Sequence, residues 1–149
     1  MSIRRIVFLF ALASILLSAQ SSEEIAVKAV VQKLFDGMAA HDAKMMGSVM
    51  LPDARLYWTR DEAAPKSTSS DEFLAHVSKL TNNLVERFTE PATVLVHGRT
   101  AQVWGKYEFL LDGKPSHCGV DSFSLLKVAD GWKIASVVYT SETSGCPGH

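Results

Sequence analysis

Residues 104–140 have the sequence WGKYEFLLDGKPSHCGVDSFSLLKVADGWKIASVVYT, and this stretch decides the fold. Apolar and polar residues alternate along most of it, which is the period of a strand with one buried face. Two Asp-Gly pairs, at 112–113 and 130–131, interrupt the alternation, and this dipeptide favours tight hairpin turns because glycine accepts a positive φ. The same pattern begins upstream, so we predict four antiparallel strands, at about 85–97, 100–111, 117–128 and 132–141.

Before these strands the apolar residues recur at the period of a helix. Ser21 and Glu24 have the spacing of a capping box, which predicts that the first helix begins there. Asp42 is placed to cap a short second helix, which we expect to end at Leu51-Pro52.

A strand is predicted at 54–59, followed by a polar loop at 60–69. Ser69 or Ser70 then caps a third helix, with the sequence DEFLAHVSKL. Helices followed by an antiparallel meander give an α+β fold. We expect one face of the sheet to pack on the three N-terminal helices, and the curled sheet to leave a cleft between them.

The first 19 residues are expected to be a secretory signal peptide. Arg4 and Arg5 precede a run of uncharged, mostly apolar residues, and Ser18-Ala19 supply small residues for cleavage. The run is short for a bilayer of ~30 Å, so we expect no stable membrane insertion after cleavage. Residues 20–149 would then form a single domain in the periplasm or outside the cell.

The composition argues against several classes of protein. A chain of 149 residues that is 47% hydrophobic and 21% charged is typical of a globular domain and not of a disordered one. A net charge of −1 without a Lys/Arg block disfavours nucleic-acid binding. The sequence has no glycine-rich phosphate loop, and we expect no cofactor. His117 and Cys118 would point to opposite faces of a strand, so no metal site is expected either.

The predicted register of the last hairpin indicates which face of the sheet carries the candidate catalytic residues. If Asp130-Gly131 is a two-residue turn, Phe123 pairs with Val138 on the face with the larger apolar residues, which we assign to the core. Asp121 shares that face, and so does His117 four residues earlier.

The register of the 100–111 strand stays open. Treating the other Asp-Gly pair in the same way places Glu108 opposite His117 and Trp104 opposite Asp121. A slip of one residue would flip the whole strand and bring Tyr107 inward instead of Glu108. In both cases an imidazole and a carboxylate lie at the open end of an apolar cleft.

The same residues resemble the C-terminal sheet of the nuclear transport factor 2-like superfamily, and they are most similar to exported bacterial members labelled lumazine-binding-like. The shared pattern is W-x-x-Y-E-F, G-x-x-S-H-C-G-x-D-x-F and G-W-K-I, with matches at Trp104, Tyr107, Glu108, Phe109, His117, Cys118, Gly119, Asp121, Phe123, Gly131, Trp132, Lys133 and Ile134. His41-Asp42-Ala43 also resembles the superfamily's H-D-A helix junction. The resemblance implies a cone of three helices against a strongly curved sheet, with a pocket inside.

Two functions follow as hypotheses, and whether the protein is an enzyme stays open. The first is an exported protein that binds a small, partly apolar organic molecule. The second is a cofactor-independent isomerase, cyclase or dehydratase, activities that occur in the superfamily, with Asp121 as base and His117 as proton relay. Alternatively, these two side chains only satisfy each other's hydrogen bonds at the end of the sheet.

The expected ligand-binding residues are of two kinds. Stacking and apolar contact would come from four aromatic residues, namely Trp58, Phe73, Trp104 and Phe123. Polar groups of the ligand would be oriented by Tyr107 and Glu108 together with His117 and Asp121. A third hypothesis is homodimerisation through the outward face of the sheet, for which the candidates are Tyr139, Val137 and Leu126.

The two cysteines of the chain, Cys118 and Cys146, are candidates for a disulfide. Export to an oxidising compartment favours pairing. A straight strand would carry Cys146 too far along, but the residues Ser144-Gly145 and Pro147-Gly148 favour a turn that folds it back. Alternatively, Cys118 packs as a small apolar residue without a partner.

Overall fold

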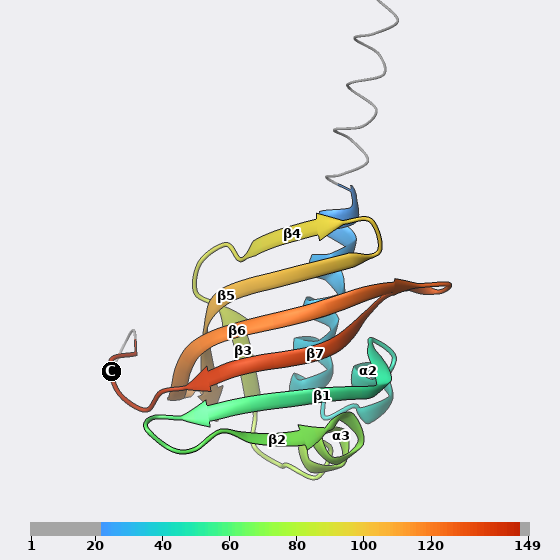
Figure 1. Cartoon of the computed structure of the whole chain (residues 1–149). Coiled ribbons are helices and arrows are strands. Elements are labelled where there is room, and N and C mark those ends of the chain that lie inside the picture. The colour runs from blue at the N-terminus through green and yellow to red at the C-terminus, as the bar shows by residue number, and fades with distance from the viewer. Residues whose placement is uncertain (1–21, 147–149) are drawn as a thin grey trace, which may run out of the picture.

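The computed structural model describes residues 22–146, which form one curved sheet with helices on one side (Figure 1). A helix over residues 22–39 comes first. The elements after it are α2 (Ala43–Gly47), β1 (Met50–Arg60), β2 (Lys66–Ser69), α3 (Ser70–Val77), β3 (Leu84–Phe88), β4 (Thr93–His97), β5 (Thr100–Leu111), β6 (Lys114–Val128) and β7 (Gly131–Ser141). The strand order is β2-β1-β7-β6-β5-β3, with β4 also paired to β5, so the sheet is not closed. The expected signal peptide and the capping box at Ser21 lie outside the described residues.

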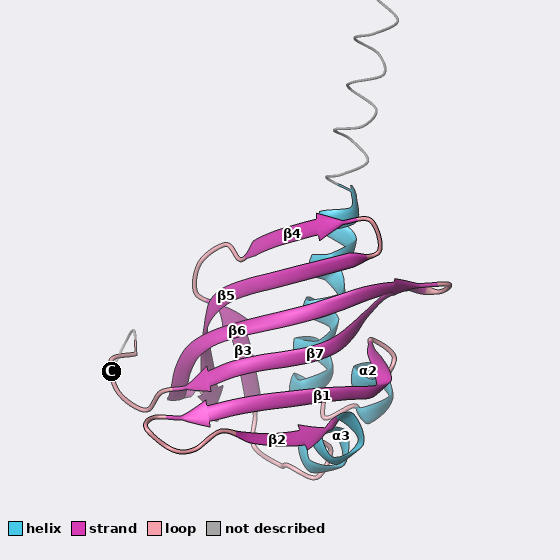
Figure 2. Ribbon diagram, in the orientation of Figure 1, coloured by secondary structure: helices cyan, strands magenta, loops and turns pink. Residues whose placement is uncertain are grey.

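The helix over residues 22–39 crosses behind the sheet and supplies much of the core (Figure 2). Its buried side chains recur at helical spacing and are Val27, Val31, Leu34, Phe35 and Met38. They pack against the inner face of the sheet, where Phe123, Leu125 and Ile134 are almost completely buried. Within residues 22–146, no helix has the length and apolar character needed to cross a membrane.

The two short helices begin where their capping residues predict. The side chain of Asp42 accepts a hydrogen bond from the backbone N–H of Met45 at 2.9 Å. Ser69 caps α3 in a reciprocal capping box with Glu72. However, α2 ends at Gly47 and not at Leu51-Pro52, which belong to β1. β1 and β2 lie between α2 and α3, and the strand predicted at 54–59 is part of β1.

Two strand predictions needed correction. The loop predicted at 60–69 contains β2, which pairs with β1. The single strand predicted at 85–97 is divided into β3 and β4, with Pro91 between them, and proline cannot donate to a strand ladder. Both halves pair with β5, β4 with its first part and β3 with its last, so β5 spans the bend of the sheet.

The β5–β6 hairpin has the predicted turn and then a bulge. Asp112 and Gly113 have φ values of 52° and 76°, and Leu111 pairs with Lys114 across them. Ser116 is then an extra residue on β6, so that Phe109 and not Glu108 faces His117. Beyond this bulge the register is the one-residue slip left open by the sequence.

The β6–β7 hairpin differs from its predicted register. The turn consists of Ala129-Asp130, because Val128 pairs with Gly131. Ala135 is then an extra residue on β7, and Phe123 faces Val137. This bulge reverses the alternation in the rest of β7, so Val138, which we expected in the core, is 52% exposed.

Candidate functional site

A cavity of about 600 Å³ lies between the helices and the inner face of the sheet. Most of its wall is apolar. The helices contribute Leu34, Met38, Phe73 and Val77, the turn after α3 contributes Leu80, and the strands contribute Leu56, Trp58, Leu84, Phe109, Leu111, Phe123 and Val137. A cavity of this size and character can enclose a small organic molecule.

Four polar side chains from four strands converge on this apolar space: Glu86 of β3, Tyr107 of β5, Asp121 of β6 and Tyr139 of β7. Asp121 is only 2% exposed. Its carboxyl group forms a hydrogen bond with that of Glu86, which requires one of the two to carry a proton. Among residues 22–146, no N–H or hydroxyl group donates to Oδ2 of Asp121.

The pKa values of both carboxyl groups are raised. Burial is the main cause for Asp121, and the charge of the neighbouring Glu86 adds to it. Burial raises the pKa of Glu86 to about 7, against the effect of the hydrogen bond from Asp121. The pair therefore keeps a proton at neutral pH, which the two carboxyl groups share.

The side chain of Tyr107 lies near this pair and reaches from β5 to the end of β7. Its hydroxyl donates to the backbone carbonyl of Thr140 at 2.8 Å, and burial raises its pKa well above the ordinary value. Tyr107 pairs with Gly119, where a Cβ atom would collide with the carbonyl oxygen of Thr140. Glycine at 119 therefore lets the end of β7 approach β6 closely enough to receive this hydrogen bond.

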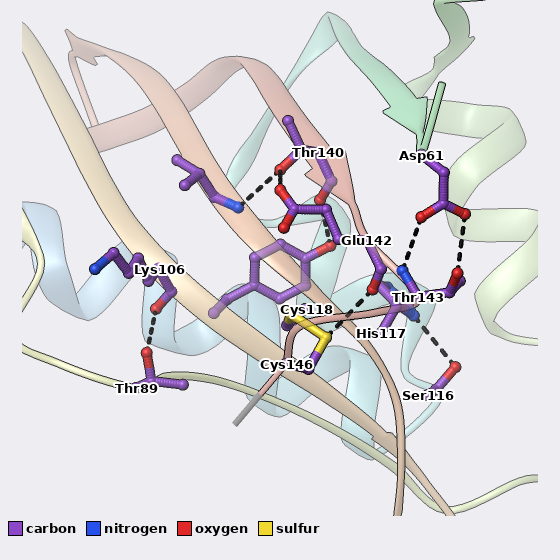
Figure 3. Close-up of a disulfide and its surroundings, with 12 residues drawn as sticks. Asp61, Thr89, Lys106, Ser116, His117, Cys118, Thr140, Glu142, Thr143 and Cys146 are labelled. Carbon is purple, nitrogen blue, oxygen red and sulfur yellow. Dashed lines mark hydrogen bonds between the residues drawn. A yellow bond between two sulfur atoms is a disulfide. The ribbon is translucent and has the colours of Figure 1, made fainter. Parts of the chain in front are cut away.

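His117 lines the cavity nearer to its rim. Its ring stacks on Phe109 with a centroid distance of 4.7 Å, and Ser116 Oγ lies 3.2 Å from Nδ1 (Figure 3). Burial lowers the pKa of His117, and the charge of Arg60 lowers it further. The imidazole is therefore neutral at pH 7 and can donate or accept one hydrogen bond.

The aromatic residues of the cavity come from three directions. Trp58 stacks on Tyr139 with a centroid distance of 5.8 Å and an interplanar angle of 11°. Phe73 lines the cavity from α3. Phe123 lines it from the inner face of the sheet, where its ring makes an edge contact with the ring of Phe35. Of the residues expected from the sequence, Trp58, Phe73, Tyr107, His117, Asp121 and Phe123 thus line one cavity.

Two expected ligand-binding residues, Trp104 and Glu108, lie on the other face of the sheet, because the bulge at Ser116 shifts the register by one residue. Trp104 is 47% exposed. Glu108 forms an ion pair with Arg87, with 2.6 Å between Oε1 and Nε. Their assignment to the pocket was wrong.

The second bulge, at Ala135, changes the residues expected on the outward face. Val137 and Tyr139, predicted to face outward, line the cavity instead. Leu126 is on the outward face and is 44% exposed. Glu86, which also lines the cavity, was not predicted from the sequence. The alternation of β3 could have revealed it, because Leu84, Glu86 and Phe88 share one parity and the first of them is buried.

The structure joins Cys118 and Cys146 in a disulfide, with Cα atoms 5.6 Å apart (Figure 3). Cys118 also exchanges two backbone hydrogen bonds with Glu142, and Thr143 donates to both carboxylate oxygens of Asp61. These contacts hold the segment after β7 against the outer face of β6 at Cys118. No group of three metal-ligating side chains is placed to hold an ion in the part of the chain that the structure describes.

Comparison with known proteins gives one family and many similar folds. A family model described as "Putative lumazine-binding" matches residues 22–140. A nuclear transport factor 2-like superfamily protein from Salmonella enterica has a TM-score of 0.69 at 13% identity, over 87% of this chain and 98% of the other. A nuclear transport factor 2-like protein with a cystatin-like fold from Novosphingobium aromaticivorans has a TM-score of 0.66 at 18% identity, over 93% and 92%.

A third structure, described as a "putative dehydratase" of the same superfamily from Streptomyces avermitilis, has a TM-score of 0.67 at 19% identity, over 82% of this chain and 97% of the other. The search of curated proteins found no match. At these identities the structural matches establish the fold alone.

Proposed function

Because the chain belongs to this lumazine-binding-like family of the nuclear transport factor 2-like superfamily, we propose that it binds a small organic molecule with a flat ring. One observation carries the proposal: an apolar cavity of about 600 Å³ in which polar side chains of four strands converge. The apolar wall would bury the body of the ligand, and the polar groups would fix its orientation.

The aromatic wall is the reason for expecting a flat ring. Trp58 and Tyr139 already stack on each other, and both line the cavity. Aromatic faces favour ligands that stack in the same way, and such contacts add to the effect of buried area. Phe73 would contact the same ligand from the helix side.

Tryptophan fluorescence tests the proposal, with lumazine as the probe and calorimetry as the measure of affinity. Trp58 lines the cavity, whereas Trp104 lies on the outer face of the sheet. We expect lumazine to quench the fluorescence of the wild type and of Trp104→Phe, and to have little effect on Trp58→Phe. Equal quenching in the two variants would contradict binding in the cavity.

Mass spectrometry of small molecules that co-purify with the folded protein extends this test to unknown ligands. We expect a ring compound that is released on unfolding. If neither lumazine nor any co-purifying compound binds, the proposed function is wrong.

A second candidate function is proton transfer in an isomerase, cyclase or dehydratase reaction. It is favoured by Asp121, which is buried, has a raised pKa and shares the cavity with the neutral His117. Asp121 would act as base and His117 as relay. Asp121→Asn should then lower turnover about 100-fold while the protein stays folded. An active variant would exclude the general-base role and leave binding as the function.

We also propose that the protein acts in the periplasm or outside the cell. The proposal is supported by the positively charged start and apolar run before residue 20, and by the disulfide, a bond that persists in oxidising compartments. N-terminal sequencing of the exported protein should find Gln20 first, and a protein that keeps Met1 in the cytoplasm would contradict it.

A further inference from the structure

The carboxyl pair of Glu86 and Asp121 has no lysine or arginine partner among residues 22–146. Two carboxyl groups joined by a hydrogen bond hold at least one proton, and the pair becomes negatively charged when the second proton leaves, which for Glu86 occurs around pH 7. The ion pairs found within residues 22–146 involve other acids, and none joins Glu86 or Asp121 to a lysine or arginine. Glu108, on the outer face, has Arg87 as its partner instead.

The other groups that line the cavity do not supply this cation. Tyr107 on β5 directs its proton to the carbonyl of Thr140, and Tyr139 on β7 is neutral because its pKa is raised to about 12. His117 on β6 is neutral as well, because burial lowers its pKa.

The remaining titratable side chains of the cavity wall belong to exposed residues, namely Arg60 at the end of β1 and Glu72 and His76 on α3. The helix over residues 22–39 contributes only apolar side chains to the wall, Leu34 and Met38. Among the residues that the structure describes, the interior of the cavity therefore has two acidic groups and no positively charged side chain.

A charge in apolar surroundings is costly unless it is paired. A ligand nitrogen that carries a positive charge would provide the missing partner and could donate to Glu86, which is the more accessible carboxyl group of the pair, while Oδ2 of Asp121 receives no hydrogen bond from the described residues. The faces of Trp58 and Tyr139 would favour the same charge, because aromatic faces attract cations.

We propose that the cavity selects ring-bearing organic cations, such as a protonated amine on an aromatic body, and that Glu86 and Asp121 are the residues that receive the charged nitrogen. This inference rests on the proposed function, because it specifies the ligand class of the same cavity. It assigns Glu86, which lies outside the matched motifs of the C-terminal sheet, as a specificity-determining residue.

Three probes with one ring and different charges test the inference by calorimetry at pH 7. They are 1-naphthylmethylamine as the cation, 1-naphthalenemethanol as the neutral analogue and 1-naphthoate as the anion. We expect the amine to bind about tenfold or more tightly than the alcohol, since a hydrogen bond to a charged group is worth more than a neutral one. The anion should bind more weakly than both.

Two variants locate the effect, with a matched control. Glu86→Gln and Asp121→Asn keep the side-chain shape and should each reduce the preference for the amine to about threefold or less. Glu108→Gln removes a carboxylate from the adjacent strand but from the outer face, and should keep the wild-type preference. Circular dichroism identifies a variant that fails to fold, and the other variant then decides.

The pH dependence provides an independent readout. A bound cation favours the deprotonated pair, and Glu86 has a pKa of about 7, so binding should release a proton and affinity for the amine should rise between pH 6 and 8. The alcohol should show no such rise.

The outcomes separate this inference from the proposed function. Equal affinity for amine and alcohol, or a preference for the amine that survives in both variants, would overturn the inference while binding in the cavity stands. If none of the naphthyl compounds binds and lumazine does not bind either, the proposed function fails, and the inference fails with it.

Discussion

The inner and outer faces of the sheet contain similar residues but differ in their surroundings. On the inner face, Val103 and Phe123 are at most 1% exposed. On the outer face, Trp104 and Leu126, which are equally large and apolar, are 47% and 44% exposed, and Val138 is 52% exposed. Size and polarity therefore do not decide which face a residue takes. The register decides, and in this sheet two bulges set the register.

The acids of the two faces differ in the same way. Glu108 on the outer face has an arginine partner and contact with water. Asp121 on the inner face has another carboxyl group as its partner, and its pKa is raised. The outer pair contributes to the surface of the fold, whereas the inner pair is stable only with a bound proton or, by our inference, a bound cation.

The largest expected effect comes from removing one aromatic ring from each face. Phe123→Ala should lower the free energy of unfolding by about 3–5 kcal/mol, because it leaves a cavity in the core. Trp104→Ala should cost about 1 kcal/mol or less, because the ring is half-exposed. Urea unfolding of both variants measures the difference. Similar losses of unfolding free energy in the two variants would contradict the difference in burial between the two faces.

A loss of stability of intermediate size is expected at the disulfide, where the segment after β7 covers the outer face of the sheet. Cys118 is on that face but only 7% exposed, because the segment after β7 is bound to it through Cys146. Opening this loop, which spans 28 residues, should cost about 3 kcal/mol in the chain-entropy model. Unfolding of the double variant Cys118→Ala/Cys146→Ala measures this cost. Titration of two free thiols in the denatured, non-reduced wild type would contradict the disulfide itself.

The smallest of the three effects concerns Glu86 and pH. Its pKa is about 7 in the folded protein and near 4.5 in the unfolded chain, so the folded protein binds more protons between these values. The stabilisation is complete below about pH 4 and is lost as the pH rises through 7. Relative to Glu86→Gln, the wild type should therefore lose on the order of 2 kcal/mol between pH 4.5 and 7.5.

Glu108→Gln is the control for this measurement, because Glu108 lies outside the cavity and should follow the wild type. Chemical unfolding at several pH values gives the comparison. If the difference in unfolding free energy between wild type and Glu86→Gln stayed constant from pH 4.5 to 7.5, the pKa of Glu86 would not be raised.

Features that depend on neighbouring residues could be predicted from the sequence. Asp42 and Ser69 cap their helices through residues within the first turn, and Asp112-Gly113 forms its turn because glycine accepts a positive φ. The α+β fold, and the six of the eight expected site residues that line the cavity, followed from these features and from the alternation of the strands.

Features that depend on distant pairing could not be predicted. The bulges at Ser116 and Ala135 have no local signal, since serine and alanine are ordinary strand residues, and each reverses the alternation beyond it. Trp104 and Val138 were therefore assigned to the wrong face. Glu86 shares the parity of the buried Leu84, which is a local signal, but only the pairing of β3 with the far end of β5 brings Glu86 to the cavity.

The extra residue at Ala135 has a consequence for how relatives of this protein could differ in ligand choice. With Ala135 present, Val137 and Tyr139 face the cavity and Val138 faces outward. A strand of the same length without the bulge would alternate regularly from Ile134, present Val138 to the cavity and turn the phenol of Tyr139 away. Loss of the bulge would thus exchange a polar wall for an aliphatic one without any change of side chain in β7. Removing Ala135 itself would instead absorb the bulge and keep Val137 and Tyr139 in the cavity wall.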